Sequence, residues 1–164
     1  MKTLLLTLLI SIGSFAQKES YQYFSVGSDT KFLGKDLIFN AGCVGKDFEM
    51  FIGYEVFKKI NFDKYTAGAG YHFPRYVKNV KVDIVPSIDF NIINRWSDWG
   101  GGLGDRNQKS SHIAFGGNLA FRIEITDRIM IENQFQFLPR VDLNTMYGGR
   151  TVRISNFSKI IIKL

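Results

Sequence analysis

The clearest pattern in the chain is a strict alternation of apolar and other residues over residues 112–138. This stretch reads HIAFGGNLAFRIEITDRIMIENQFQFL and contains two alternating runs on either side of Thr126-Asp127-Arg128. A period of two predicts β-strands with one apolar face, because successive side chains of a strand point to opposite sides. The short polar break between the runs predicts a hairpin.

The same alternation predicts six further strands along the chain. Their ranges are Tyr21–Gly27, Asp36–Val44, Phe48–Lys58, Asp63–Phe73, Val80–Ile92 and Thr151–Leu164. Pro74 and Arg75 are expected to begin the turn after the fourth of the eight strands. Pro86 falls inside the fifth strand and lacks a ladder donor, so it predicts a β-bulge.

The connections between the predicted strands alternate in length. Those after strands two, four and six are short, whereas the others tend to be longer, and two are predicted as surface loops, 94–109 and 143–150. Short turns at one end and longer loops at the other are typical of barrels in bacterial outer membranes. The predicted fold is therefore all-β, an eight-stranded antiparallel up-and-down transmembrane β-barrel.

Residues 1–16 have the pattern of a secretory signal peptide. A Lys follows Met1, residues 3–15 are apolar or small, and Ser14 and Ala16 fit a cleavage site before Gln17. The apolar run is too short to cross a bilayer as a helix. We therefore expect a signal peptide at 1–16 and a single barrel domain at 17–164. Gln17 stands where a lipoprotein would need Cys.

The character of the two faces indicates which one meets lipid. The polar face carries many small residues, including several glycines, which suit the narrow interior of an eight-stranded barrel. The apolar face carries large aromatic residues, too many to fill one small lumen. This favours a membrane barrel with its apolar face outward. A soluble periplasmic lipocalin-like barrel that binds lipid is the alternative, with the apolar face inward.

Charged residues of both signs fall on the predicted lumen face. They are Glu49, Glu55, Asp83, Asp89, Glu124 and Glu132 against Arg122, Arg153, Lys81 and Lys159. Arg122 and Glu132 share a depth across the hairpin, provided that it contains an odd-length loop or a bulge. We interpret the charges as a structural plug of ion pairs that neutralises buried charge, in preference to a selectivity or gating cluster. The predicted lumen cluster is Glu55, Asp83, Asp89, Arg122, Glu124, Glu132 and Arg153.

The longest loop carries the residues that we expect to bind an external partner. They are Arg95, Trp96, Asp98, Trp99, Asp105 and Arg106. The two Trp residues could stack on sugar or lie among lipid headgroups, or they could pack over the barrel mouth. The formal net charge of +6 fits contact with an anionic surface such as lipopolysaccharide, and the export signal argues against nucleic acid.

Candidate chemistry is sparse. His72 and His112 are expected near opposite ends of the barrel, so they cannot share a site, and we predict neither a metal nor a cofactor. Ser111 and His112 at the external rim are similar, in residue type alone, to the residues of membrane-embedded lipid-modifying enzymes. Cys43 is the single cysteine, so an internal disulfide is excluded.

The pattern from Tyr21 to Leu164 resembles the small outer-membrane β-barrel families of the OmpA transmembrane domain and OmpX type. The resemblance is architectural and departs from those families at the last strand, which lacks a terminal aromatic residue. It implies a non-enzymatic, monomeric barrel in the outer membrane of a Gram-negative bacterium. Its loops would contact lipopolysaccharide or an external protein or phage, and the alternatives are the lipid-modifying enzyme and the soluble barrel.

Overall fold

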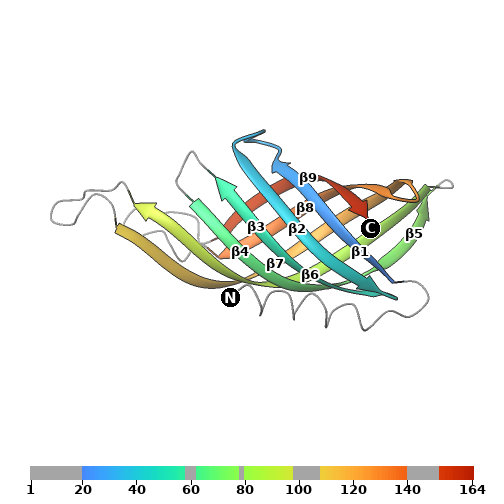
Figure 1. The fold of residues 1–164 in the computed structure, drawn as a ribbon, viewed down its shortest axis with the longest axis horizontal. Helices are drawn as coiled ribbons and strands as arrows, with labels where there is room; N and C mark the ends of the chain where they lie inside the picture. The colour runs from blue at the N-terminus through green and yellow to red at the C-terminus, as the bar shows by residue number, and fades with distance from the viewer. Residues whose placement is uncertain (1–19, 58–61, 78–79, 98–107, 140–151) are drawn as a thin grey trace.

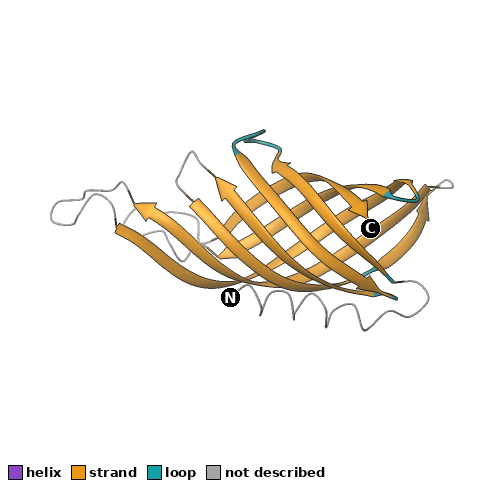
Figure 2. Cartoon of the chain, in the orientation of Figure 1, coloured by secondary structure: helices purple, strands orange, loops and turns teal. Residues whose placement is uncertain are grey.

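The computed structural model describes residues 20–57, 62–77, 80–97, 108–139 and 152–164, and for ten of these residues near strand ends only the backbone. The described residues form nine β-strands that wrap around one axis (Figures 1 and 2). The strands are β1 (Tyr21–Asp29), β2 (Asp36–Gly45), β3 (Phe48–Phe57), β4 (Phe62–Tyr71), β5 (Phe73–Val77), β6 (Val80–Ser97), β7 (Gln108–Thr126), β8 (Ile129–Pro139) and β9 (Val152–Lys163). The predicted signal peptide and the loop at 143–150 lie outside the described residues.

The nine strands close into an antiparallel barrel with eight strand positions, because β4 and β5 share one position. Their order is β4-β3-β2-β1-β9-β8-β7-β6-β5, and an additional pairing of β4 with β6 closes the sheet. Because β4 and β5 pair with successive parts of β6, together they occupy the position of one interrupted barrel strand. The predicted fold class is confirmed. No helix among the described residues is long and apolar enough to cross a bilayer.

The interruption between β4 and β5 lies opposite Pro86. Gly70 pairs with Ser87, and Phe73 pairs with Ile84. Residues 71–72 therefore face residues 85–86 across the interruption. Pro86 cannot donate a hydrogen bond to this ladder. The predicted bulge is wrong, because Pro86 pairs with Leu119 of β7 in unbroken register.

The predicted turn at Pro74 and Arg75 is also wrong, because both residues lie within β5. The N–H of His72 donates to the carbonyl of Asp47, toward β3. Alternation along the strand then points the nitrogen of Pro74 to the same side, beyond the last β3–β4 pair at Phe48 and Tyr71. A proline is tolerated there because β5 pairs only with β6 among the described strands.

We expect Pro74→Thr to increase self-association of the protein in detergent. The substitution restores a backbone N–H on the unpaired edge of β5, and open edges recruit further strands. Molar mass from light scattering during gel filtration measures the effect. Arg75→Thr is the matched control, because its N–H faces β6; equal masses for the two variants would show that Pro74 does not protect this edge.

The hairpin of β7 and β8 places Arg122 directly opposite Glu132. Both side chains point inward because the register shifts between Glu124 and Thr126. Of the two expected arrangements, the hairpin therefore contains the bulge and not the odd-length loop. The hairpin of β6 and β7 is longer than expected. Its last pair is Ser97 with Gln108, so the predicted loop at 94–109 shrinks to residues 98–107.

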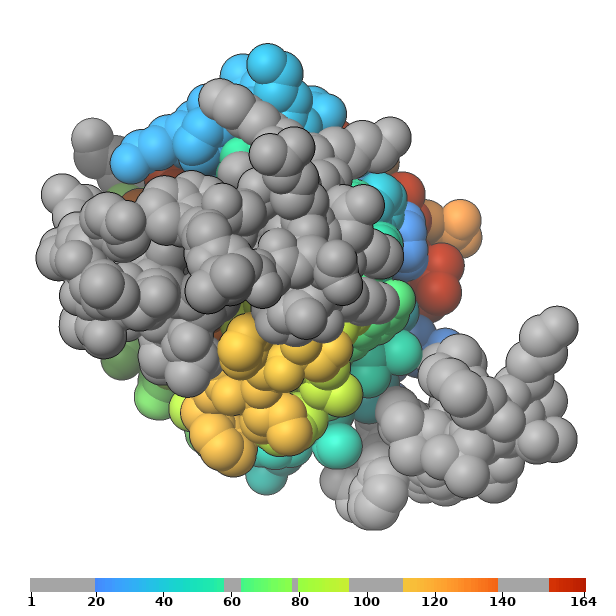
Figure 3. Space-filling view, turned by 90° about the vertical axis from the view of Figure 1, so that its left-hand side faces the viewer, coloured from blue at the N-terminus to red at the C-terminus, as the bar shows by residue number. Residues whose placement is uncertain are grey.

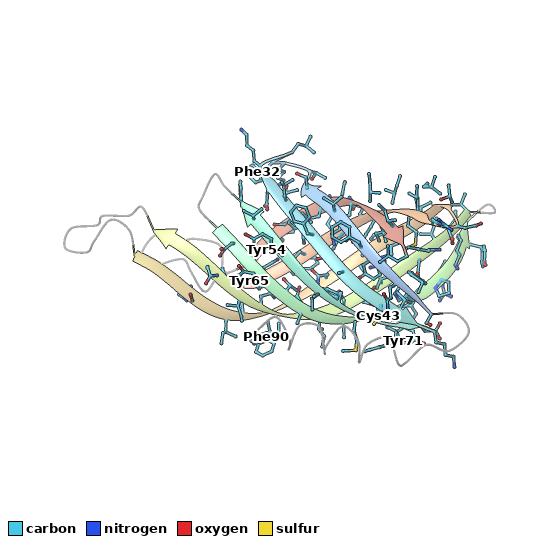
Figure 4. All side chains as sticks on the ribbon, in the orientation of Figure 1. Phe32, Cys43, Tyr54, Tyr65, Tyr71 and Phe90 are labelled. Atoms are coloured by element: carbon cyan, nitrogen blue, oxygen red, sulfur yellow. The ribbon has the colours of Figure 1, made fainter. Side chains whose placement is uncertain are left out.

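The barrel has a polar interior and an apolar outer face, as the alternation predicts. Ile88 and Phe115 on the outer face are 74% and 72% exposed, whereas Lys64 and Asn91 in the lumen are fully buried. Figure 4 shows Phe90 projecting away from the wall. A soluble barrel would bury its apolar side chains, so this arrangement is the one that a lipid environment stabilises.

Candidate functional site

Arg122 is the centre of a buried ion-pair network in the half of the lumen nearer the short turns. Its two terminal nitrogens donate to the two carboxylate oxygens of Glu49, at 2.8 and 3.2 Å, and its Nε donates to Glu132 at 2.5 Å. Each of these three residues is at most 4% exposed. A planar guanidinium suits this position because it can serve two carboxylates at once.

The network continues around the barrel wall through neighbouring strands. Glu132 is the register partner of both Arg122 on β7 and Lys159 on β9, and the Lys159 ammonium lies 2.8 Å from Glu132. The hydroxyl of Tyr23 donates to Glu49 at 3.3 Å. Gly42 makes room for that ring, because a Cβ at this position would come within 2.8 Å of Tyr23.

His72 extends the network to the barrel mouth at the short-turn end. Its Nε2 lies 3.3 Å from Glu49, and its Nδ1 contacts the Asp83 carboxylate. A cavity of about 400 Å³ opens beside these residues, and the Glu124–Lys163 ion pair, at 2.5 Å, lines it. The lining carries charges of both signs, with Lys46, Lys81, Arg122 and Lys163 against Asp47, Asp83 and Glu124.

The half of the lumen nearer the long connections contains a separate ion pair and a layer of apolar side chains. Lys64 lies 2.5 Å from Glu55 and donates to Gln136 at 2.7 Å. An apolar layer lies nearby, toward the long-connection end. It consists of Phe57, Ile93, Ala114 and Leu138, with Phe32 packed against it.

The structure therefore divides the predicted lumen cluster into separate groups along the axis. Arg122 and Glu132 lie together, whereas Glu55 pairs with Lys64 at the other end. Asp89 lies between them and accepts hydrogen bonds from two asparagines, Asn91 at 2.7 Å and Asn118 at 2.9 Å. Asp83 and Glu124 lie at the short-turn mouth. The side chain of Arg153 lies outside the described residues.

Lys64 is the partner that the sequence prediction missed. Glu49 and Lys159 were expected on the lumen face, and His72 was expected to form hydrogen bonds there, but none of the three was assigned to the predicted cluster. A signal for them exists in the sequence, because each shares the parity of the polar positions on its own strand. The sequence does not show which strands bring them to the same depth.

The predicted surface residues are only partly visible in the structure. Arg95 and Trp96 lie on β6, not in a loop, and their side chains are outside the described residues. Asp98, Trp99, Asp105 and Arg106 lie in 98–107, also outside them. Ser111 is exposed and donates to Asn94 at 2.7 Å. Its neighbour His112 points to the opposite face of the strand, so the two do not form a nucleophile–base pair.

The centre of the lumen is filled by side chains. Among the described residues, a cavity of about 10 Å³ lies between Tyr23, Glu49 and Lys159. An eight-stranded barrel encloses space for packed side chains and no continuous aqueous channel. We expect no large steady conductance from the protein in planar-bilayer recordings. A sustained single-channel current after reconstitution would contradict a packed lumen.

Solved structures that share the fold include three bacterial surface or outer-membrane proteins. No protein-family model and no curated protein matches the sequence. The N-terminal β-barrel domain of Pseudomonas aeruginosa OprF is 11% identical, with a TM-score of 0.61, 88% of this chain covered and 97% of that one. Neisserial surface protein A is 17% identical, with a TM-score of 0.52 and coverages of 88% and 96%.

The third structure is the Yersinia pestis outer membrane protein Ail in a phospholipid nanodisc. It is 10% identical to this chain, with a TM-score of 0.51, and the alignment covers 89% of this chain and all of Ail. At these low identities the structural similarity shows the fold alone and carries no site residue across. The chain has the fold of the small eight-stranded outer-membrane β-barrels, and this agrees with the polar lumen and the apolar outer face described above.

Proposed function

We propose that the protein is a non-enzymatic outer-membrane barrel that contacts lipopolysaccharide through the connections at its long-loop end. The observation that carries the proposal is the inside-out distribution of polarity, with exposed Ile88 and Phe115 outside and paired charges inside. Such an outer face is stable in lipid. The three structural neighbours share this fold. One is named as a surface protein and another as an outer membrane protein.

The sequence of the connections supports an anionic partner. The four connections at the long-loop end are 30–35, 58–61, 98–107 and 140–151, and together they contain seven Lys or Arg residues against three Asp. The connections 46–47, 78–79 and 127–128 at the other end contain three against two. An excess of positive charge at one end attracts phosphate groups and raises the rate of association with them.

Binding of lipopolysaccharide by the barrel in phosphatidylcholine nanodiscs tests the proposal. We expect the affinity to fall by roughly tenfold or more between low and high salt, because surface charges are screened. Lipopolysaccharide from which the phosphates have been removed is the control ligand. Equal binding of both forms would contradict an electrostatic contact.

The lipid-modifying enzyme is less well supported, because Ser111 and His112 lie on opposite faces of β7. We expect Ser111→Ala and His112→Ala to leave the lipid A composition of expressing cells unchanged by mass spectrometry. Loss of a modified lipid species in either variant would favour the enzyme.

A further inference from the structure

The connection between β1 and β2 is a compact loop with a defined conformation. The carboxylate of Asp29 accepts the N–H of Lys31 at 2.7 Å, and the hydroxyl of Ser28 accepts the N–H of Gly34 at 2.9 Å. Gly34 has a φ of 72°, which favours glycine. The carbonyl of Phe32 accepts the N–H of Lys35 at 2.8 Å. The loop is thus held in place before any partner arrives.

The loop turns one apolar side chain inward and leaves another, with two lysines, on its outer surface. Phe32 turns inward and packs on Phe57, with ring centroids 4.9 Å apart. Leu33 is 74% exposed, and Lys31 and Lys35 on either side of it are also exposed. The nearest acids, Asp29 and Asp36, are buried. The surface of the loop therefore presents one apolar side chain between two ammonium groups, while the two acids that flank the loop in sequence are buried.

The loop is short enough to stay close to the lipid-facing wall. The last pair between β1 and β2 is Ser28 with Leu37, and Leu37 and Phe39 share the outward parity of β2. Leu33 lies four residues from Leu37, which is at most about 13 Å at the rise of a strand. The hydrogen bond from the Asp36 N–H to the Phe32 carbonyl folds the loop back to a lower height. The polar headgroup layer on each side of a bilayer is roughly 5–8 Å thick. Figure 3, which views the long-loop end, shows the blue segment that contains this loop at its upper edge.

We propose that Lys31 and Lys35 bind phosphate groups of outer-leaflet lipids, while Leu33 inserts at the boundary with the acyl chains. This proposal rests on the proposed membrane function and identifies three residues that contact the lipids. An exposed leucine between two lysines suits a lipid surface, because the apolar side chain enters the boundary and the ammonium groups reach the phosphates. A soluble polyanion would use the lysines alone and leave Leu33 in water.

A spin label at position 33 tests the depth of the loop. We use Leu33→Cys in a Cys43→Ser background, in vesicles of phosphatidylcholine with or without lipopolysaccharide, and compare accessibility to oxygen and to a water-soluble nickel complex. The label is expected at the headgroup–acyl boundary. Lys46→Cys in the same background is the control, because it lies at the tip of the β2–β3 turn at the opposite end. Full water accessibility at position 33 would overturn the proposal.

The double variant Lys31→Gln/Lys35→Gln tests the charges. Each lysine near an anionic surface contributes about a fivefold preference, so we expect the affinity for lipopolysaccharide or phosphatidylglycerol vesicles to fall roughly 20- to 30-fold. Lys46→Gln/Arg128→Gln is the matched control at the other end and should change little. An unchanged affinity of the first variant overturns the proposal. Failure of the unmodified barrel to insert into vesicles would instead contradict the membrane function itself.

Discussion

Replacing Arg122 by alanine is expected to lower the free energy of unfolding of the barrel by about 3–5 kcal/mol. The substitution leaves the buried carboxylates of Glu49 and Glu132 without their shared cation. Among the described residues, Glu132 keeps Lys159, whereas Glu49 keeps the contacts of Tyr23 and His72. The cost arises because an unpaired charge in a closed lumen is poorly solvated, and the lost attraction of the pair itself is the smaller part.

Urea unfolding in lipid vesicles, followed by gel migration, measures this loss. Arg128→Ala is the control, because Arg128 is exposed in the β7–β8 turn, and its substitution should change the free energy by less than about 0.5 kcal/mol. Restoring stability in the double variant Arg122→Met/Glu49→Gln, which keeps the Glu132–Lys159 ion pair, would further support the interpretation. A loss below about 1 kcal/mol for Arg122→Ala would show that water or other groups solvate the two carboxylates.

Replacing Ile88 by arginine is expected to cost about 2–4 kcal/mol in a bilayer. Ile88 is 74% exposed on the outer face, and its register partners Ala69 and Gly117 place it well inside the strands. A charge at this depth has to leave water and enter hydrocarbon. In a soluble barrel, the same exposed position would accept arginine at little cost.

Unfolding of Ile88→Arg in bilayers, compared with Asp127→Arg, separates these two cases. Asp127 is exposed in the β7–β8 turn, where the introduced charge stays in water and should have almost no effect. Equal stability of the two variants would mean that the outer face of β6 does not contact lipid.

The faces of the strands could be predicted from the sequence because alternation is a local property. His112 to Leu138 shows this best, since every inward residue of that hairpin follows from its parity. Pro74 and Pro86 misled the prediction for a different reason. Whether a proline interrupts a ladder depends on the side to which its nitrogen points and on the neighbouring strand, and local sequence contains neither.

The ion pairs were harder to predict, because a pair requires equal depth as well as a common face. Arg122 and Glu132 belong to one hairpin, and the short turn determines their register. Glu49 lies 73 residues from Arg122, and the tilt and closure of the whole barrel bring the two together. The prediction therefore grouped Glu55 with Arg122, although Glu55 pairs with Lys64 in the other half of the lumen.

Gel migration of the outer-membrane fraction, with and without boiling, tests the central claim most directly. A membrane barrel with this paired lumen should sediment with the outer membrane, require detergent for extraction and migrate faster when it is not boiled. Recovery of the protein from the soluble periplasm without detergent, with the same migration before and after boiling, would contradict the claim.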